Sequence, residues 1–536
     1  MALTIVDWVT IAVYFAAVFA VGFYFARRER TSKEYFLAGR NVLWFAIGAS
    51  IFASNIGSEH LIGLAGSGAK SGLAVGAYEW AAVFCIMVLA WVFLPYYLGS
   101  NVFTMPEFLE RRFNPGCRWT LTTISIIAYV FTKISVSLFA GAILIEVVTG
   151  WPIYVSVMIL VIATGIYTIA GGLSAVIYTE VIQTFILIGG SLLLTLIGLD
   201  RVGGFDGLRA ALPADHFQMI KPMTDQAYPW TGTTIGIFIL GVWYWCSDQV
   251  IVQRALGAKN LTNARGGAIL TAWLKIIPVF IFVLPGLIAC VLWPEQLADD
   301  PDKAYPLIVK NLLSDVFPGA AGLMIAALLA ALMSSLSAVF NSCSTLVTMD
   351  VYKKFKPDAS ERRLVLVGRL VTGAIVVISL LWIPMIRLLS DQLYQYLQSI
   401  QAYVGAPIAA VFLVGVFWKR ATGKAALTTM IVGSVLGAVR FATDVLAKMG
   451  YGDFGPFNIL AGYAFLNYAV IMFAFCVVLM IVVSLFTKQP EAKQTENLTF
   501  STGTMSTGMD NAWVWVHAAL SVLVVVVVIC LWAHFA

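Results

Sequence analysis

A run of small, polar and ionisable residues, "ASNIGSEH" at 53–60, interrupts an otherwise apolar stretch of the chain. Glycine and serine allow a membrane helix to open, and an opened helix releases main-chain carbonyl groups, here those of Ala53 and Ile56. Carbonyls of unwound helices are the ligands that membrane proteins use for small alkali cations. The alternative is a kink filled by neighbouring side chains, and this segment alone does not choose between the two.

A second group of oxygens lies far downstream, in "AALMSSLSAVF" at 330–340. Helical spacing puts the carbonyl of Ala331 and the hydroxyls of Ser334 and Ser335 within one turn and on one side. Added to the two carbonyls near residue 55, they make five neutral oxygen ligands, a set that suits Na⁺. Tandem serines also serve close helix packing, which is the competing interpretation.

Ionisable side chains occur inside or at the ends of apolar stretches as well, namely Glu59, His60, Glu79 and Lys275. Such groups are expensive in hydrocarbon and mark functional sites by default. Lys275 needs an anionic partner, and Glu79 would serve. These residues offer a carboxylate, an ammonium and an imidazole, and Gln398 adds an amide. Together they provide the hydrogen-bond donors and acceptors that a ring of hydroxyl groups needs. The alternatives are an interfacial, solvated Glu79 and a histidine that merely packs.

Tyr78 precedes Glu79, and Tyr244 and Trp245 lie in the interrupted stretch "WYWCSDQ". All three offer flat apolar faces to the C–H side of a pyranose. Aromatic side chains also fill gaps beside helix breaks. Two further acids, Glu180 and Asp248, lie in or near the membrane. Glu180 is a candidate for a second cation site, and pairing with Arg254 is the alternative.

Composition places these residues in a membrane protein. Of the 536 residues, 60% are hydrophobic and 11% are charged, whereas soluble domains carry about 25% charged residues. A spanning helix needs about 20 mostly apolar residues, and we expect fourteen such helices. The predicted spans are 5–26, 44–69, 78–100, 120–148, 151–170, 174–199, 230–252, 266–292, 317–350, 362–388, 393–417, 424–447, 457–487 and 513–535.

The distribution of Lys and Arg predicts the topology. The first span ends in "ARRERTSKEYFLAGR", which should be cytoplasmic, so both termini should lie outside the plasma membrane (the inner membrane in a bacterium). The net charge of +5 is dispersed among short loops, which argues against nucleic-acid binding. The seven cysteines and four histidines form no disulfide framework, metal cluster or nucleophile–base pair, so we do not expect an enzyme. The sequence does not predict an oligomeric state.

The spans fall into two comparable sets of five, and "SNIGSEH" and "WYWCSDQ" interrupt corresponding members. Matching interruptions indicate an inverted-repeat transporter with its site near mid-membrane. The predicted units are a first accessory helix and its cytoplasmic link (1–43), the two repeats (44–199 and 230–417), an outer loop between them (200–229), and accessory C-terminal helices (418–536) with a flexible cytoplasmic linker at 488–511.

In this order along the chain, "YFLAGR", "GASIFASNIGSEHLIGLAGSGAKSGLAVGAYEW", "TMPEFLERRF", "WYWCSDQVIVQRALGAKN", "ALMSSLSAVFNS" and "APIAAVFLVGVFWKR" resemble the solute:sodium symporter family, and within it the sodium/glucose cotransporters. The resemblance covers about residues 35 to 420. It implies an all-α integral membrane fold of about fourteen helices, built on a leucine-transporter-like 5+5 inverted-repeat core with two broken helices.

The resemblance also implies site residues. The family's sodium site falls on Ala53, Ile56, Ala331, Ser334 and Ser335. Its sugar site falls on Asn55, His60, Tyr78, Glu79, Lys275 and Gln398, with Tyr244 as the inner gate and Trp245 beside it. Glu180 and Ser337 are candidates for a second sodium site or an exit path.

Three positions bear on specificity. His60 matches the animal glucose transporters, where the bacterial galactose symporter has Gln. Gly241 stands where that symporter has an Asn that touches sugar, and Glu180 replaces an Asp usual in the family.

We therefore expect a sodium-coupled symporter of a monosaccharide that works by alternating access. Myo-inositol, another small polyol or a small carboxylate are alternative substrates. A sugar-gated sensor or channel without net sugar transport is the alternative from another class.

Overall fold

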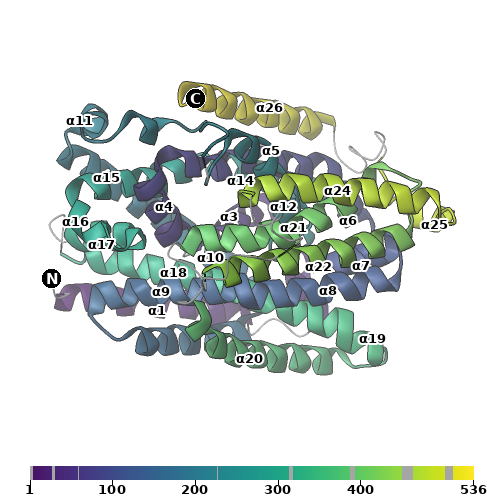
Figure 1. The fold of residues 1–536 in the computed structure, drawn as a ribbon. Helices are drawn as coiled ribbons and strands as arrows, with labels where there is room; N and C mark the ends of the chain where they lie inside the picture. The colour runs from purple at the N-terminus through teal and green to yellow at the C-terminus, as the bar shows by residue number, and fades with distance from the viewer. Residues whose placement is uncertain are drawn as a thin grey trace.

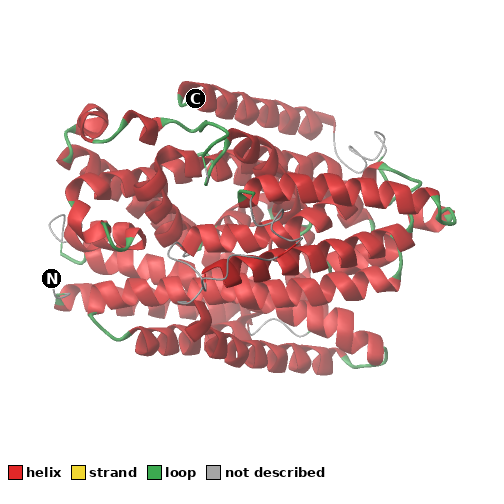
Figure 2. Cartoon of the chain, viewed as in Figure 1, coloured by secondary structure: helices red, strands yellow, loops and turns green. Residues whose placement is uncertain are grey.

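The structure is a computed structural model, and it describes residues 4–26, 31–57, 59–225, 227–312, 318–386, 393–448, 455, 463–500 and 511–536. The regular elements in these ranges are helices (Figure 2). The longer helices are α1 (Ile5–Ala26), α3 (Trp44–Asn55), α5 (Ala77–Val88), α8 (Pro115–Tyr129), α9 (Ser135–Thr149), α10 (Ile153–Arg201), α12 (Ile237–Cys246), α14 (Leu261–Leu274), α18 (Ala320–Thr345), α20 (Glu361–Ile386), α21 (Leu393–Phe417), α22 (Gly423–Lys448), α24 (Phe465–Leu485) and α26 (Asn511–His534). Short elements used below are η2 (Glu59–Leu64), α4 (Ala65–Ser71), η3 (Gly72–Gly76), α7 (Met105–Arg112), η5 (Val130–Ile134), α11 (Gly204–Ala211), α13 (Gln249–Leu256), η10 (Leu346–Tyr352) and α25 (Ala492–Thr495).

The chain is a multi-pass membrane protein. Within the described ranges, 11 helical segments are long and apolar enough to cross a membrane, and counting the bent pair Gly232–Cys246 and Gln249–Leu256 gives 12. The predicted count of fourteen is not reached by this measure. Helix α3 has only 12 residues, and Tyr154–Ile166 is a shorter apolar segment. The predicted spans at 151–170 and 174–199 correspond to two helical stretches of α10 that meet at a kink at Gly172, where the backbone is not helical and φ is +50°.

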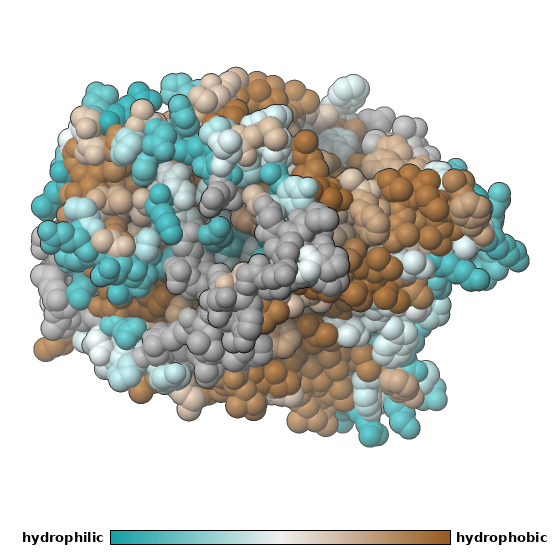
Figure 3. Space-filling view, viewed as in Figure 1, coloured by the Kyte–Doolittle hydropathy of each residue, from teal (hydrophilic) through white to brown (hydrophobic). Residues whose placement is uncertain are grey.

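The surface shows how such a molecule sits in a bilayer. Hydrophobic residues form a broad region across the helix bundle, and hydrophilic residues gather at its two ends (Figure 3). Helix α1 begins, and helix α26 ends, toward the same end of the bundle (Figure 1). The even number of crossings that the basic residues predict would place the two chain ends in this way.

The first predicted break is present between α3 and η2. Helix α3 ends at Asn55, and Ile56 leaves the helical conformation with φ −81° and ψ +88°. The Gly57 amide donates to the Asn55 carbonyl at 3.1 Å, and the His60 amide donates to the Gly57 carbonyl at 3.1 Å. In a continuous helix these two amides would have bonded to Ala53 and Ile56, so the break releases both carbonyls.

Glycine at position 57 has a steric cause. A Cβ there would lie 2.5 Å from the Glu59 Oε2 atom and 2.9 Å from the Ser335 hydroxyl. A larger residue would have to displace the Glu59 and Ser335 side chains, so glycine suits the close approach of the opened segment to α18.

The second break separates α12 from α13 at Ser247 and Asp248, and the two helices meet at a bend of 46°. Asp248 is the N-cap of α13, and its carboxylate accepts from the Val250 amide at 2.9 Å. Aspartate is a preferred N-cap because it satisfies an amide at the start of a helix. The sequence "CSDQV" therefore ends one helix and starts the next.

Whole helices surround the two broken ones. Helix α3 packs against α10 and α14, and α12 packs against α5 and α21, while α10 packs against α18. The interior thus holds both breaks away from the lipid-facing surface, as a site near mid-membrane requires.

The C-terminal linker is partly folded in the described residues. Helix α25 carries a capping box between Glu491 and Gln494, and the Phe500 amide donates to the Val416 carbonyl at 2.8 Å. Residues 488–500 therefore contact α21 and the end of α7. Residues 501–510 lie outside the described ranges, and the predicted flexibility of 488–511 stays a prediction.

Gly72 allows a test of this packing. It has φ +73° and ψ −155°, a conformation open almost only to glycine, and a Cβ there would overlap the His216 carbonyl oxygen. Gly203 also has positive φ, but the nearest atom to its Cβ would be 3.7 Å away. We expect Gly203→Ala to cost about 1 kcal/mol of stability and Gly72→Ala at least about 2 kcal/mol more. Thermal unfolding of the purified variants in detergent checks this, and equal melting temperatures would contradict the packing described.

Candidate functional site

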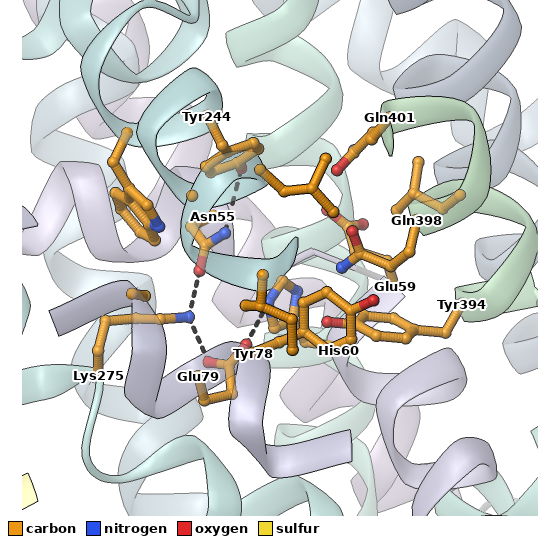
Figure 4. A pocket seen from close by; sticks show the side chains of 16 residues that line it. Asn55, Glu59, His60, Tyr78, Glu79, Tyr244, Lys275, Tyr394, Gln398 and Gln401 are labelled. Carbon is orange, nitrogen blue, oxygen red and sulfur yellow. Dashed lines mark hydrogen bonds and ion pairs between the residues drawn. The ribbon is translucent and has the colours of Figure 1, made fainter. Parts of the chain in front are cut away.

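The residues predicted to bind substrate line one cavity beside the first break (Figure 4). They come from five helical regions: α3, η2, α5, α12 and α21, joined by Lys275 at the end of α14. Those that the sequence predicted are Asn55, His60, Tyr78, Glu79, Tyr244, Trp245, Lys275 and Gln398. The helix break at Asn55 and the end of α14 at Lys275 thus bring polar groups together from residues that are 220 positions apart.

Lys275 and Glu79 form an ion pair at the base of this cavity. Both side chains are almost fully buried, with 1% and 2% of the side chain exposed. The Lys275 ammonium also donates to the Asn55 Oδ1 atom at 2.5 Å, and the second Glu79 oxygen lies 3.2 Å from His60 Nε2. Lys275 is therefore neutralised within the protein, as the sequence predicted.

The aromatic residues close the cavity on two sides. The Asn55 amide donates to the Tyr244 hydroxyl at 3.1 Å, and the Lys275 ammonium lies 5.5 Å from the ring centre of Trp245. Tyr78 meets Tyr394 edge to face at 5.5 Å between ring centres. Flat rings and charged groups thus face a common space.

Sequence analysis missed several lining residues, chiefly Tyr394 and Gln401, and did not assign Glu59 to the site. Tyr394 lies four residues before Gln398 on α21, and Gln401 lies three after it. Side chains at these spacings share a helix face, so the helical period around Gln398 was the available signal.

Gly241 also lines the cavity. A Cβ at this position would lie 2.5 Å from the Cys85 Sγ atom on α5. The close packing of α12 on α5 explains why glycine stands here, and no side chain from position 241 reaches the ligand space.

Two of the predicted cation ligands, Ser335 and Ile56, are in contact at the first break. The Ser335 hydroxyl donates to the Ile56 carbonyl at 3.4 Å, which joins α18 to the opened segment. Ser334 points to Glu180 instead, with its hydroxyl 2.8 Å from Oε1. The released Ala53 and Ile56 carbonyls and the α18 hydroxyls are oxygen donors of the kind that Na⁺ takes.

Glu180 pairs with Arg254, as one of the two interpretations expected. The Arg254 Nη2 atom lies 3.5 Å from Glu180 Oε1, and both side chains are fully buried. Ser54 donates to the same carboxylate at 2.9 Å. The hydroxyl of Ser337, by contrast, is buried without a hydrogen-bond partner among the described residues.

The fold and this cavity define a class of protein, namely a membrane transporter with two broken helices around a central site. Residues 35–433 match the sodium:solute symporter family, and the chain belongs to that family. It is a transporter rather than an enzyme.

Several curated relatives are similar over most of this chain. The mouse sodium/glucose cotransporter 4 is 42% identical over 90% of this chain and 76% of its own length. The rabbit sodium/glucose cotransporter 1 is 40% identical over 90% and 79%. The rabbit sodium/myo-inositol cotransporter 2 is 41% identical over 92% and 79%.

Solved structures confirm the fold class. A Na⁺-coupled sialic acid symporter, captured outward-open with substrate, superposes with a TM-score of 0.77 at 23% identity, over 91% of this chain and 99% of that one. Mhp1, a nucleobase-cation-symport-1 family transporter, superposes with a TM-score of 0.54 at 16% identity, over 87% and 97%. The all-α, leucine-transporter-like 5+5 architecture expected from the sequence is therefore present, although these likenesses fix neither the helix count nor the predicted unit boundaries.

Lys275→Met would leave the Glu79 carboxylate buried without its cation. We expect a loss of about 3–5 kcal/mol in stability, the usual effect of breaking a buried ion pair. Lys493 is the matched control, because its ion pair with Glu491 is exposed, and Lys493→Met should leave the melting temperature unchanged. Unfolding of both variants in detergent is the measurement, and a Lys275→Met variant as stable as the parent would rule out the ion pair.

Proposed function

We propose that the chain is a sodium-coupled symporter that carries a monosaccharide across the plasma membrane by alternating access. The sugar would bind in the cavity lined by Asn55, Lys275 and Gln398. Sodium would bind between the opened segment at Ala53 and Ile56 and the α18 residues Ala331, Ser334 and Ser335. The names of the relatives, which are sodium/glucose and sodium/myo-inositol cotransporters, support both ligands.

The observation that carries the sugar proposal is a set of buried polar atoms that line the cavity without a partner among the described residues. They are one oxygen of Glu59, the Nδ1 atom of His60 and the hydroxyl of Tyr78. A buried polar atom without a hydrogen bond costs about 1–3 kcal/mol. A ligand with several hydroxyl groups donates and accepts around its ring, and it would satisfy all three.

The charge balance favours a neutral ligand. The Lys275 ammonium already pairs with Glu79, so a carboxylate substrate would have to displace that partner. The faces of Tyr244 and Trp245 suit the apolar side of a pyranose. A neutral polyol such as myo-inositol shares the same chemistry and is the second candidate.

Coupling would follow from the first break. Asn55 contributes its side chain to the sugar cavity, and the next residue, Ile56, contributes its carbonyl to the cation site. Either ligand would therefore favour the same arrangement of this segment. A ligand shifts a conformational equilibrium only by its differential affinity for the two states, and the shared segment provides that difference.

Sodium would also bring energy from the membrane potential. One elementary charge moved across 100 mV is worth about 2.3 kcal/mol, which corresponds to about a fiftyfold accumulation. One sodium ion per sugar would thus support a useful concentration gradient of sugar.

We propose Glu180 and Ser337 as an exit path or second sodium site. The Ser337 hydroxyl, which has no partner among the described residues, supports this proposal, and the Glu180–Arg254 ion pair opposes it.

We also propose that both termini lie outside and that the two broken helices, one in the first repeat (44–199) and one in the second (230–417), rock against the scaffold. The basic residues of the short loops support the orientation. The two chain ends lie toward the same end of the bundle, which fits both termini on one side of the membrane (Figure 1).

Uptake into proteoliposomes tests the proposed function. Labelled glucose should concentrate inside when an inward sodium gradient is imposed, and it should not do so when K⁺ or choline replaces Na⁺. Competition with galactose, myo-inositol and lactate then identifies the substrate class. Currents without accumulation would favour a sensor or channel, and inhibition by lactate alone would overturn the polyol proposal.

Ser335→Ala tests the cation site. The lost hydroxyl should raise the sodium concentration for half-maximal uptake about tenfold, equivalent to about 1.4 kcal/mol, while the order of preferred sugars stays the same. Ser344→Ala is the control, since Ser344 lies on the same helix but donates to the Gly368 carbonyl at 2.8 Å. Equal sodium dependence in the two variants would move the cation site elsewhere.

A further inference from the structure

A second buried ion pair joins the other broken helix to an unbroken one. The Lys133 ammonium lies 3.0 Å from Asp248 Oδ1, and the two side chains are 7% and 1% exposed. Lys133 belongs to η5, in the continuous run from α8 to α9, and Asp248 occupies the break between α12 and α13. Burying both charges is costly, so a pair in this place calls for a functional explanation.

A second contact joins the same two elements. Tyr129, one turn before Lys133, accepts a hydrogen bond from the Gln249 amide at 3.1 Å through its hydroxyl. Asp248 also accepts from the Val250 amide, so its carboxylate is fixed to the start of α13. The break is therefore held to the α8–α9 helix by adjacent residues on both sides.

The ion pair reaches the cavity through an aromatic ring. The Lys133 ammonium lies 4.5 Å from the ring centre of Tyr244, within the range of a cation–π contact. The hydroxyl of that ring accepts from Asn55 inside the cavity. A line of contacts thus runs from the cavity through Tyr244 and Lys133 to the break at Asp248.

We propose that Lys133 and Asp248 form a latch that holds Tyr244 across the cavity on its proposed cytoplasmic side. This inference rests on the proposed function, because it assigns the latch to one state of the transport cycle. The latch joins a broken helix to an unbroken helix, so it must open whenever one moves relative to the other. Lys133 and Asp248 are positioning residues that act through Tyr244 without touching the ligand.

Cys343 offers a native reporter. It is fully buried on α18, which packs against η5, the element of Lys133, and against α13, which begins after Asp248. When the latch opens, water and a charged thiol reagent should reach it from the cytoplasmic side. The other cysteines, Cys85, Cys117, Cys246, Cys290, Cys476 and Cys530, are replaced by alanine in the reporter protein.

The experiment measures the labelling rate of Cys343 by a membrane-impermeant methanethiosulfonate added to the proposed cytoplasmic side, in Na⁺ without sugar. Asp248→Asn keeps the shape and the capping oxygen but removes the charge, and it should raise the rate about fivefold or more. Lys133→Gln should do the same, and the double variant should label no faster than either single one, because one contact is lost in all three. Lys133→Arg keeps the charge and should stay within about twofold of the parent.

Unchanged labelling in Asp248→Asn, in protein that elutes as a single folded species, would overturn the latch, as would additive effects in the double variant. If Asp248→Asn does not fold, the labelling rate of Lys133→Gln is judged by the same criterion. If neither variant folds, the labelling rate of Tyr129→Phe is measured instead, because this change removes only the hydrogen bond from the Gln249 amide. Labelling needs no transport, so it tests the latch even if the parent moves no sugar. Failure of the proposed function would show separately, as missing sodium-driven uptake by the parent.

Discussion

Hydrocarbon cannot solvate a charge, and this constraint governs how the interior of the molecule is arranged. Each of the buried ion pairs named here joins different helical elements: Glu79 with Lys275, Asp248 with Lys133, Glu180 with Arg254, and Asp350 of η10 with Arg118 of α8. Separating one of these pairs would leave a bare charge in a dry environment. The pairs therefore restrict the relative positions of helices that apolar packing alone would leave free to slide, since lipid contacts are as favourable as contacts between apolar side chains.

Three of these ion pairs lie around the two helix breaks: Glu79–Lys275, Asp248–Lys133 and Glu180–Arg254. Unwinding a helix in the membrane exposes amides and carbonyls that need partners, and it is tolerated only where the protein interior or a cavity supplies them. At the first break the neighbouring Ser335 hydroxyl supplies one such partner, and at the second break Asp248 caps the following helix. The hydroxyl and carboxylate groups that stabilise the two breaks lie beside the candidate ligand sites. The helix breaks and the candidate sites are therefore parts of one arrangement.

Sequence reasoning reached the fold class and the lining of the cavity because polar residues in apolar stretches are conspicuous. "SNIGSEH" and "WYWCSDQ" located both breaks, and Lys275 predicted its partner Glu79. Tyr394 and Gln401 were missed because the helical period around Gln398, which places both on the same face of α21, was not followed along that helix. The count of fourteen spans is not confirmed, because α3 stops short at Asn55 and the apolar helix Tyr154–Ile166, before the kink at Gly172, is shorter than a full span. The pairing of Lys133 with Asp248 joins residues 115 positions apart, which no periodicity reveals.

The two breaks differ in what they contact: the first faces the cavity and α18, and the second is bound to an unbroken helix. The first presents Asn55 to the cavity and the Ile56 carbonyl to α18, so a cation and a polyol would stabilise the same backbone conformation, and linkage makes such an effect reciprocal. The second carries Tyr244 and is tied by Asp248 to an unbroken helix. Tyr244 and Asn55 share a hydrogen bond, so the conformation at the first break is transmitted to the second. A ligand that reorients Asn55 must therefore either carry Tyr244 with it or break that bond. In the proposed transport cycle, ligand occupancy at the first break and closure at the second would be parts of a single equilibrium.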